Sequence, residues 1–315
     1  MDILKLLSHF EGFDPEVYDR FDTRRKAMRQ FAGIGKKLTL ASLPLAASAM
    51  IQKAYGQTNT GNVAYALQLA LKAEYLESHF YVTGINAAQG LGLQGDTLGK
   101  LKRIGYDELL HVEAVRATLA TIERPQVPYV GPMADKPAGA DYGIDITGGG
   151  GNGNGPMAPA LTNLDVFLAA AQAFEDNGVR AYKGQATNVM PNKPVLAAAL
   201  GIHSVEARHA AALRKIRADR AGVQNGYMPK PWPTGADPGN IPEPYNAKVA
   251  PLYGPGIGNP NMFPSESNTM QAGINIAQLG VTNAQATESF DEPQEGDTVV
   301  RYLTGQVLPD VKFIY

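Results

Sequence analysis

Four segments of about 25 residues, each with apolar residues at helical spacing, constrain the fold of this 315-residue chain more than any other feature. They cover roughly residues 62–88, 96–123, 162–188 and 194–219. At a rise of 1.5 Å per residue, each such helix is about 38 Å long, a length typical of helical bundles. The connections between the segments are short, long and short in turn, and a glycine-rich run at 148–155 lies in the long one. We therefore predict an all-α four-helix bundle, built from two helical hairpins joined by a long crossover.

Residues at the starts of three segments are typical of helix N-termini. Asp96 is suited to cap the second segment, and Thr162 with Asp165 three residues later forms a capping-box pattern before the third. Pro194 suits the first turn of the fourth segment, where a missing N–H costs nothing. These signals support the predicted helix starts.

Composition excludes several functions. The chain has no cysteine, which rules out disulfides, iron–sulfur clusters and thiol nucleophiles, so any metal must be held by histidines and carboxylates. Its formal charge of −2, from 28 basic and 30 acidic residues, argues against a nucleic-acid partner. A G-x-G-x-x-G match at 90–95 follows a predicted helix and not a strand, so we interpret it as a hairpin loop and expect no dinucleotide cofactor.

The inward stripe of each predicted helix is apolar at its ends and polar in its middle. The polar positions are one glutamate on each of two helices and a Glu-x-x-His pair on each of the other two: Glu74, Glu175, Glu108 with His111, and Glu206 with His209. The i, i+3 spacing puts both members of a pair on one helix face. Four carboxylates buried together without partners would be very costly, and two divalent cations would balance their charge. The sequence therefore predicts a dinuclear metal site in which these six side chains are the ligands.

A tyrosine follows the first glutamate of each hairpin by seven residues. Tyr81 lies seven residues after Glu74 and Tyr182 seven after Glu175, so the hairpins repeat one another. We expect the two hydroxyls to hydrogen-bond ligand carboxylates across the bundle, although both rings also suit a purely structural role in the core. Glu77, one turn beyond Glu74, is an alternative ligand in its place.

At these residues the sequence resembles the ferritin-like superfamily, and in particular the exported bacterial ferritin-like domain proteins that include the desiccation-related group. The phrases that carry the resemblance are those at 73–81, 107–111, 173–179 and 203–209, and the likeness covers about residues 62–219.

The resemblance implies a specific role for each predicted ligand. It makes Glu74 and Glu175 terminal ligands, Glu108 and Glu206 bridging ligands, and His111 and His209 the nitrogen ligands. The expected cofactor is a pair of metal ions, iron in the first place and manganese as the alternative, because carboxylate and imidazole suit both.

The expected activity is a ferroxidase or oxidase reaction with dioxygen or peroxide, in oxidative-stress protection or metal handling. A manganese catalase-like disproportionation of peroxide is one alternative. A non-catalytic, desiccation-associated envelope protein is the other. No catalytic residues are expected beyond the metal ligands.

Residues 1–57 have the layout of an export signal. Thr23-Arg24-Arg25 and the following Met28-Arg29 resemble a twin-arginine motif, and an apolar run from Leu38 to Met50 follows, which is short for a membrane span. We expect export to the periplasm or surface of a bacterium and no stable membrane span. An ordinary N-terminal helix is the alternative interpretation.

The chain is expected to divide into the signal segment 1–57, the bundle 58–220 and an extension 221–315. Twelve of the 22 prolines lie between Pro229 and Pro309, so we predict an irregular extension, which also offers a surface for homo-oligomer formation. Two stretches at 298–302 and 311–315 have the composition of short β-strands.

Overall fold

The computed structural model describes residues 63–121, 144–147, 153–221, 230–234, 249–256 and 260–304. The predicted export signal at 1–57, part of the glycine-rich run and the predicted strand at 311–315 lie outside these residues. The chain divides into two compact units. Of the first, the structure describes only Gln271–Ile274, and the second contains every helix reported below. None of the described helices combines the length and apolar character that a membrane crossing needs.

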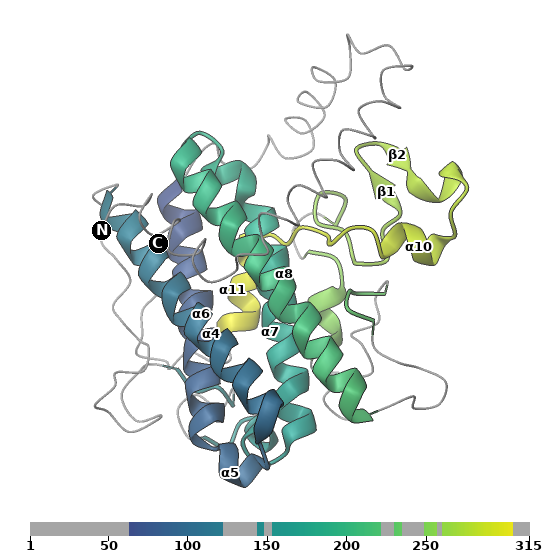
Figure 1. The fold of residues 1–315 in the computed structure, drawn as a ribbon. Helices are drawn as coiled ribbons and strands as arrows, with labels where there is room; N and C mark the ends of the chain where they lie inside the picture. The colour runs from purple at the N-terminus through teal and green to yellow at the C-terminus, as the bar shows by residue number, and fades with distance from the viewer. Residues whose placement is uncertain are drawn as a thin grey trace. The chain divides into compact units, whose positions relative to one another are not determined.

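Four long helices pack against one another (Figure 1). They are α4 (Val63–Asn86), α6 (Gly95–Thr121), α7 (Leu164–Val189) and α8 (Lys193–Ala221). In sequence order α4 pairs with α6 and α7 with α8, and the two hairpins meet through α4 against α7 and α6 against α8. A short helix, α5 (Ala88–Leu91), connects α4 to α6, and left-handed Gly92 ends it at a φ of 67°. The predicted mainly helical fold is confirmed, and each long helix ends within a few residues of its predicted bounds.

The cap of α7 differs from the prediction. Asn163 is the N-cap residue, because its backbone is extended and its side-chain oxygen accepts from the backbone N–H groups of Asp165 and Val166. Thr162 instead ends the short 3-10 helix η1 (Ala158–Leu161), where its hydroxyl donates to the Pro159 carbonyl at 3.4 Å. Asp96 lies within the first turn of α6, where its charge favours the helix dipole.

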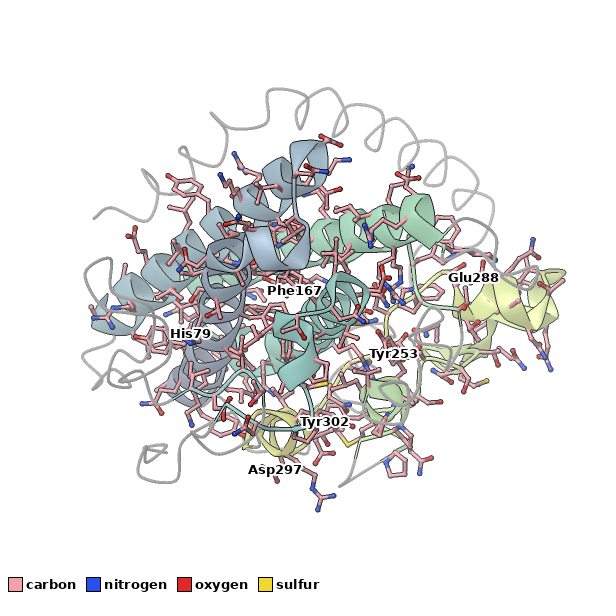
Figure 2. All side chains as sticks on the ribbon, turned by 90° about the horizontal axis from the view of Figure 1, so that it is seen from below. His79, Phe167, Tyr253, Glu288, Asp297 and Tyr302 are labelled. Carbon is pink, nitrogen blue, oxygen red and sulfur yellow. The ribbon has the colours of Figure 1, made fainter. Side chains whose placement is uncertain are left out.

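The core between α4 and α7 contains a pair of stacked aromatic rings, one of which belongs to Phe167 (Figure 2). The rings of Phe80 and Phe167 stack with centroids 4.5 Å apart and an interplanar angle of 8°. Gly84 makes this approach feasible, because a Cβ atom there would lie 2.1 Å from the Phe167 ring. The two hairpins are thus held together by close ring packing on one side of the polar middle.

The extension is more regular than predicted. It contains η2 (Ala250–Tyr253), the two-residue strands β1 (Met270–Gln271) and β2 (Ile274–Asn275), which pair, and then η3 (Ile276–Leu279), α10 (Asn283–Thr287) and α11 (Gly296–Thr304). Val249, Leu252 and Tyr253 form a buried cluster with Ala169 and Ala173 of α7. This part of the extension therefore contributes to the core.

The strand predicted at 298–302 is wrong, because these residues form α11. Val299 is fully buried and Tyr302 is partly buried, whereas Asp297 and Arg301 are exposed. This burial repeats every three to four residues, the period of a helix and not of a strand. The helix packs on α4 and α7, and the Tyr302 hydroxyl donates to the Pro251 carbonyl at 2.5 Å (Figure 2). Packing against the bundle outweighs the β-branched composition.

Candidate metal centre

Each long helix brings predicted ligands to the buried middle of the bundle. Glu74 comes from α4, Glu175 from α7, and the two Glu-x-x-His pairs from α6 and α8. The four glutamates and His111 are fully buried, and His209 is buried as well. Glu113, which is also on α6, lies outside this face and is exposed, unlike the six predicted ligands. The structure thus brings all six predicted side chains together.

The first group of ligand atoms surrounds His111. Its Nδ1 atom lies 3.2 Å from Glu74 Oε2, 3.1 Å from Glu108 Oε2 and 3.0 Å from Glu206 Oε1. A ring nitrogen carries at most one proton, so it can donate to only one of these three oxygens. The other oxygens point at a nitrogen that cannot satisfy them.

The second group surrounds His209. Its Nδ1 atom lies 2.8 Å from Glu108 Oε1 and 3.1 Å from Glu175 Oε2, and a Glu206 oxygen completes the group. Glu108 and Glu206 belong to both groups, and the two oxygens of Glu108 face different histidines. Those two carboxylates therefore hold the positions that bridging ligands would occupy.

The donor sets fit two metal ions. Ligand atoms about 2.1 Å from one metal and at right angles to each other are about 3 Å apart, which is the spacing found around each Nδ1 atom. Buried oxygens of Glu74, Glu108 and Glu206 also lack hydrogen-bond partners among the described residues. Orphaned buried carboxylate oxygens are costly, and a cation would satisfy them. Carboxylate with imidazole is a donor set that iron and manganese accept.

The pKa values of these ligand side chains reflect the same cost of burying charged groups without cations. Burial raises the pKa of Glu74 to about 7. Burial, with the charges of Glu108 and Glu175, raises the pKa of Glu206 well above its usual value. Burial alone would lower the pKa of His111, but the charges of Glu108 and Glu74 outweigh it and raise it well above the ordinary value. Without cations the bundle must keep protons on groups that normally release them, and bound cations would remove that need.

The two tyrosines cross between the hairpins. The Tyr81 hydroxyl of α4 donates to Glu175 Oε1 of α7, and the Tyr182 hydroxyl of α7 donates to Glu74 Oε1 of α4. Each tyrosine thereby fixes one oxygen of a carboxylate whose other oxygen faces a histidine. This exchange of hydrogen bonds is the arrangement that the sequence repeat predicted.

Asp107 is a residue of the site that the sequence interpretation did not assign. Its Oδ2 atom lies 3.4 Å from His209 Nε2 and accepts from Arg103 Nε at 3.0 Å. An acceptor at Nε2 keeps the proton on that nitrogen and leaves the Nδ1 lone pair free for a metal. The only sequence signal is an acidic residue directly before Glu108.

Gly178 and Glu77 also belong to the surroundings of the site. A Cβ atom at Gly178 would lie 2.4 Å from Glu206 Oε2 and 3.4 Å from Glu77 Oε1, so the glycine provides the space for Glu206. Glu77 is buried, and burial with the charges of Glu206 and Glu108 raises its pKa well above the usual value. The potential metal-binding groups contain Glu74 and not Glu77. A protonated Glu77 would leave four ionised glutamates, matching the charge of two divalent cations.

Comparison with known proteins agrees with this geometry. The family model for the ferritin-like domain matches residues 62–219, which cover α4, α6, α7, all but the last two residues of α8, and all six predicted ligands. The chain belongs to the ferritin-like domain family. Comparisons with curated proteins and with solved structures found no match. Membership and the buried Glu/His clusters are compatible with a metal site, and the role of the six residues as ligands stays a prediction.

Proposed function

We propose that this ferritin-like domain binds two divalent metal ions, iron in the first place, and supports their oxidation by dioxygen or peroxide. The observation that carries the proposal is the convergence of carboxylate oxygens on the Nδ1 atoms of His111 and His209, with Glu108 and Glu206 shared between the two groups. Shared carboxylates suit a reaction in which the metal charge changes, because their oxygens can redistribute between two ions.

In the proposed reaction, ferrous iron is the substrate that is oxidised, and dioxygen or peroxide is reduced. Two ferrous ions each lose one electron, and dioxygen takes both electrons with two protons from water and leaves as hydrogen peroxide. With peroxide as the oxidant, the same two electrons and two protons cleave it to two water molecules. Both reactions need a site that is preorganised and shielded from bulk water.

The chain's own residues provide that environment. Tyr81 and Tyr182 orient Glu175 and Glu74, and Asp107 holds the ring of His209. The stacked rings of Phe80 and Phe167 close the core between the hairpins. These contacts fix the donor atoms before any ion arrives, which lowers the cost of binding.

Metal analysis with matched variants tests the proposal. Protein purified from its native host should contain about two metal equivalents, and the double variant Glu108→Gln, Glu206→Gln should lose them while Glu113→Gln keeps them. The wild type is then loaded with ferrous iron under anaerobic conditions and mixed with dioxygen, and the oxygen that it consumes measures the reaction. Manganese with rapid oxygen release from peroxide would favour the catalase-like alternative. Two retained metals without turnover by either oxidant would favour a structural role.

Stability separates loss of metal from loss of fold. Burial keeps Glu206 protonated in the metal-free protein, so a neutral amide there should cost little. His111 and His209 instead hold the pKa of Glu108 well below its usual value despite its burial, so the metal-free double variant should be less stable than the metal-free wild type. A ligand at 100 times its Kd stabilises the folded state by about 2.7 kcal/mol, so added ferrous iron should raise the Tm of the wild type and not that of the double variant. Equal Tm shifts in both would contradict the proposed site.

We further propose that the protein is exported as a folded, metal-loaded bundle, as in the desiccation-related ferritin-like group. The support is the twin-arginine pattern at Arg24 and Arg25 and the apolar run behind it. Fractionation of the native host and N-terminal sequencing test this, with Arg24→Lys, Arg25→Lys as the variant that should stay in the cytoplasm. Recovery of wild-type protein only from the cytoplasm would refute export.

A further inference from the structure

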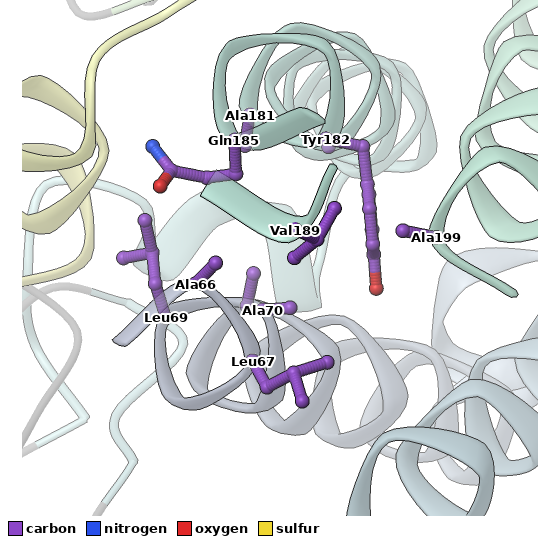
Figure 3. A pocket seen from close by; sticks show the side chains of 11 residues that line it. Ala66, Leu67, Leu69, Ala70, Ala181, Tyr182, Gln185, Val189 and Ala199 are labelled. Atoms are coloured by element: carbon purple, nitrogen blue, oxygen red, sulfur yellow. The ribbon is translucent and has the colours of Figure 1, made fainter. Parts of the chain in front are cut away.

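An apolar cavity of about 20 Å³ lies between α4 and α7 (Figure 3). The space exists because three alanines of α4, at 66, 70 and 73, and Ala181 of α7 present only methyl groups where larger side chains would fill the gap. The cavity is partly open to the exterior, and Ala70 on its wall is only half-buried.

The cavity shares two residues with the metal centre. Tyr182 forms part of its wall, and its hydroxyl donates to Glu74. Gly178 forms another part, and the space at its missing side chain is filled by Glu206. Glu74 and Glu206 both belong to the ligand group around His111, so the cavity adjoins that half of the centre.

The lining offers almost nothing to a polar guest. The Tyr182 hydroxyl already donates its proton to Glu74, and the Gln185 carbonyl accepts from the Asn188 amide at 2.6 Å. A polar molecule entering such a space loses its hydrogen bonds to water without replacement, which costs several kcal/mol. Apolar cavities stay dry and take up xenon or small apolar molecules instead.

We propose that this cavity is the entry and holding site for dioxygen at the His111 half of the centre. The inference rests on the proposed oxidation of iron and selects its oxidant. Dioxygen is small and apolar, whereas hydrogen peroxide would have to leave its hydrogen bonds behind. The volume exceeds the 10–15 Å³ that about one water-sized probe requires, which suits a diatomic molecule and excludes an organic substrate.

Xenon is the probe for the cavity itself. In full-length wild-type protein, metal-free and metal-loaded, dissolved xenon should shift the amide NMR signals of Ala66, Ala73 and Ala181. The variant Ala70→Leu should abolish these shifts, because its larger side chain occupies the space. The matched control is Ala198→Leu, which adds the same volume at a half-buried helical alanine of α8 outside the lining, and it should keep them. Absence of xenon shifts in the wild type would overturn the proposal.

Kinetics with two oxidants then test selectivity. For ferrous-loaded Ala70→Leu, the dioxygen concentration at half-maximal rate should rise about tenfold, equivalent to about 1.4 kcal/mol of lost binding, with the peroxide-driven rate and the metal content unchanged. Equal slowing with both oxidants would overturn the assignment to dioxygen. Normal iron oxidation without xenon binding refutes this inference alone. Xenon binding in a wild type that never oxidises iron refutes the proposed function, and with it dioxygen as the occupant.

Discussion

His209 and Asp107 face each other across the contact between α8 and α6, with Nε2 and Oδ2 3.4 Å apart. Burial alone would raise the pKa of Asp107, but hydrogen bonds from His209 and Arg103 lower it below its usual value. The carboxylate therefore stays ionised beside the ring. His111 differs, because its Nε2 atom is buried without a hydrogen-bond partner among the described residues. The two halves of the centre are thus unequal.

This inequality predicts that Asp107→Ala weakens metal binding in one half of the centre. Without the acceptor at Nε2, the proton of His209 can move to Nδ1, which then no longer offers its lone pair. Loss of such a partner typically lowers metal affinity about 10- to 100-fold. Anaerobic calorimetric titration with ferrous iron should show one weakened and one unchanged binding step. Arg103→Gln, which leaves the acceptor in place, should have a smaller effect, and equal weakening of both steps would argue against the assignment.

Gly178→Ala is predicted to displace Glu206. The added Cβ atom would lie 2.4 Å from Glu206 Oε2 inside the packed centre, so the carboxylate must move. Because Glu206 belongs to both ligand groups, both metal-binding steps should weaken by at least about tenfold, or about 1.4 kcal/mol each. Metal titration of the purified variant measures this effect.

The control for this substitution is Gly201→Ala in α8. Nothing lies within 4 Å of a Cβ atom there, so alanine should add roughly 0.5–1 kcal/mol of stability through helix propensity and leave metal binding unchanged. Denaturant unfolding of the metal-free forms measures the stability change. Tight metal binding in Gly178→Ala would show that Glu206 is not a shared ligand.

Arg180 of α7 is predicted to anchor the extension. Its buried guanidinium donates to the carbonyls of Leu252, Gly254, Pro264 and Glu292, and its Nε atom lies 3.0 Å from Glu266 Oε1. Burial raises the pKa of Glu266 to about 8 despite the charge of Arg180, so the main loss in Arg180→Met is the donor to the buried carbonyls, at a cost of about 1–3 kcal/mol for each group left unsatisfied.

Unfolding in denaturant and limited proteolysis measure this effect, and we expect earlier cleavage within the extension. Lys215→Met is the matched control. It removes an exposed cation of an i, i+4 pair and should change the free energy of unfolding by less than about 0.5 kcal/mol. An unchanged cleavage pattern in Arg180→Met would mean that the extension is held elsewhere.

The bundle and the grouping of the six side chains could be predicted because both follow from helix periodicity. A 3.6-residue repeat determines which residues face inward, and the polar middle of each stripe then places Glu74, Glu175 and the two Glu-x-x-His pairs at one level. Their role as ligands stays a prediction.

Other features depend on contacts that one helix pattern cannot reveal. Asp107 is rotated by about 100° from Glu108 on α6, so it lies outside the predicted stripe, and only the position of α8 brings His209 to it. Similarly, the β-branched residues near Val299 indicated a strand, but the contact of α11 with α4 and α7 favours a helix. Packing between distant parts of the chain therefore determines both the Asp107–His209 contact and the helical conformation of α11.

His79 of α4 is predicted to make stability depend on pH between about 4 and 6.5. The side chain is buried, and burial, only partly opposed by the charge of Asp145, lowers its pKa from 6.5 to about 4. In this range the unfolded chain binds a proton at His79 that the folded chain does not, so the free energy of unfolding falls as the pH drops. The full contribution, about 3 kcal/mol at 1.36 kcal/mol per pKa unit, is present above pH 6.5 and lost by pH 4. The variant His79→Gln keeps a polar side chain without a titrating proton, so unfolding of the metal-free proteins across this range should show a shallower slope for it. Parallel pH profiles for variant and wild type would mean that folding does not lower the pKa of His79.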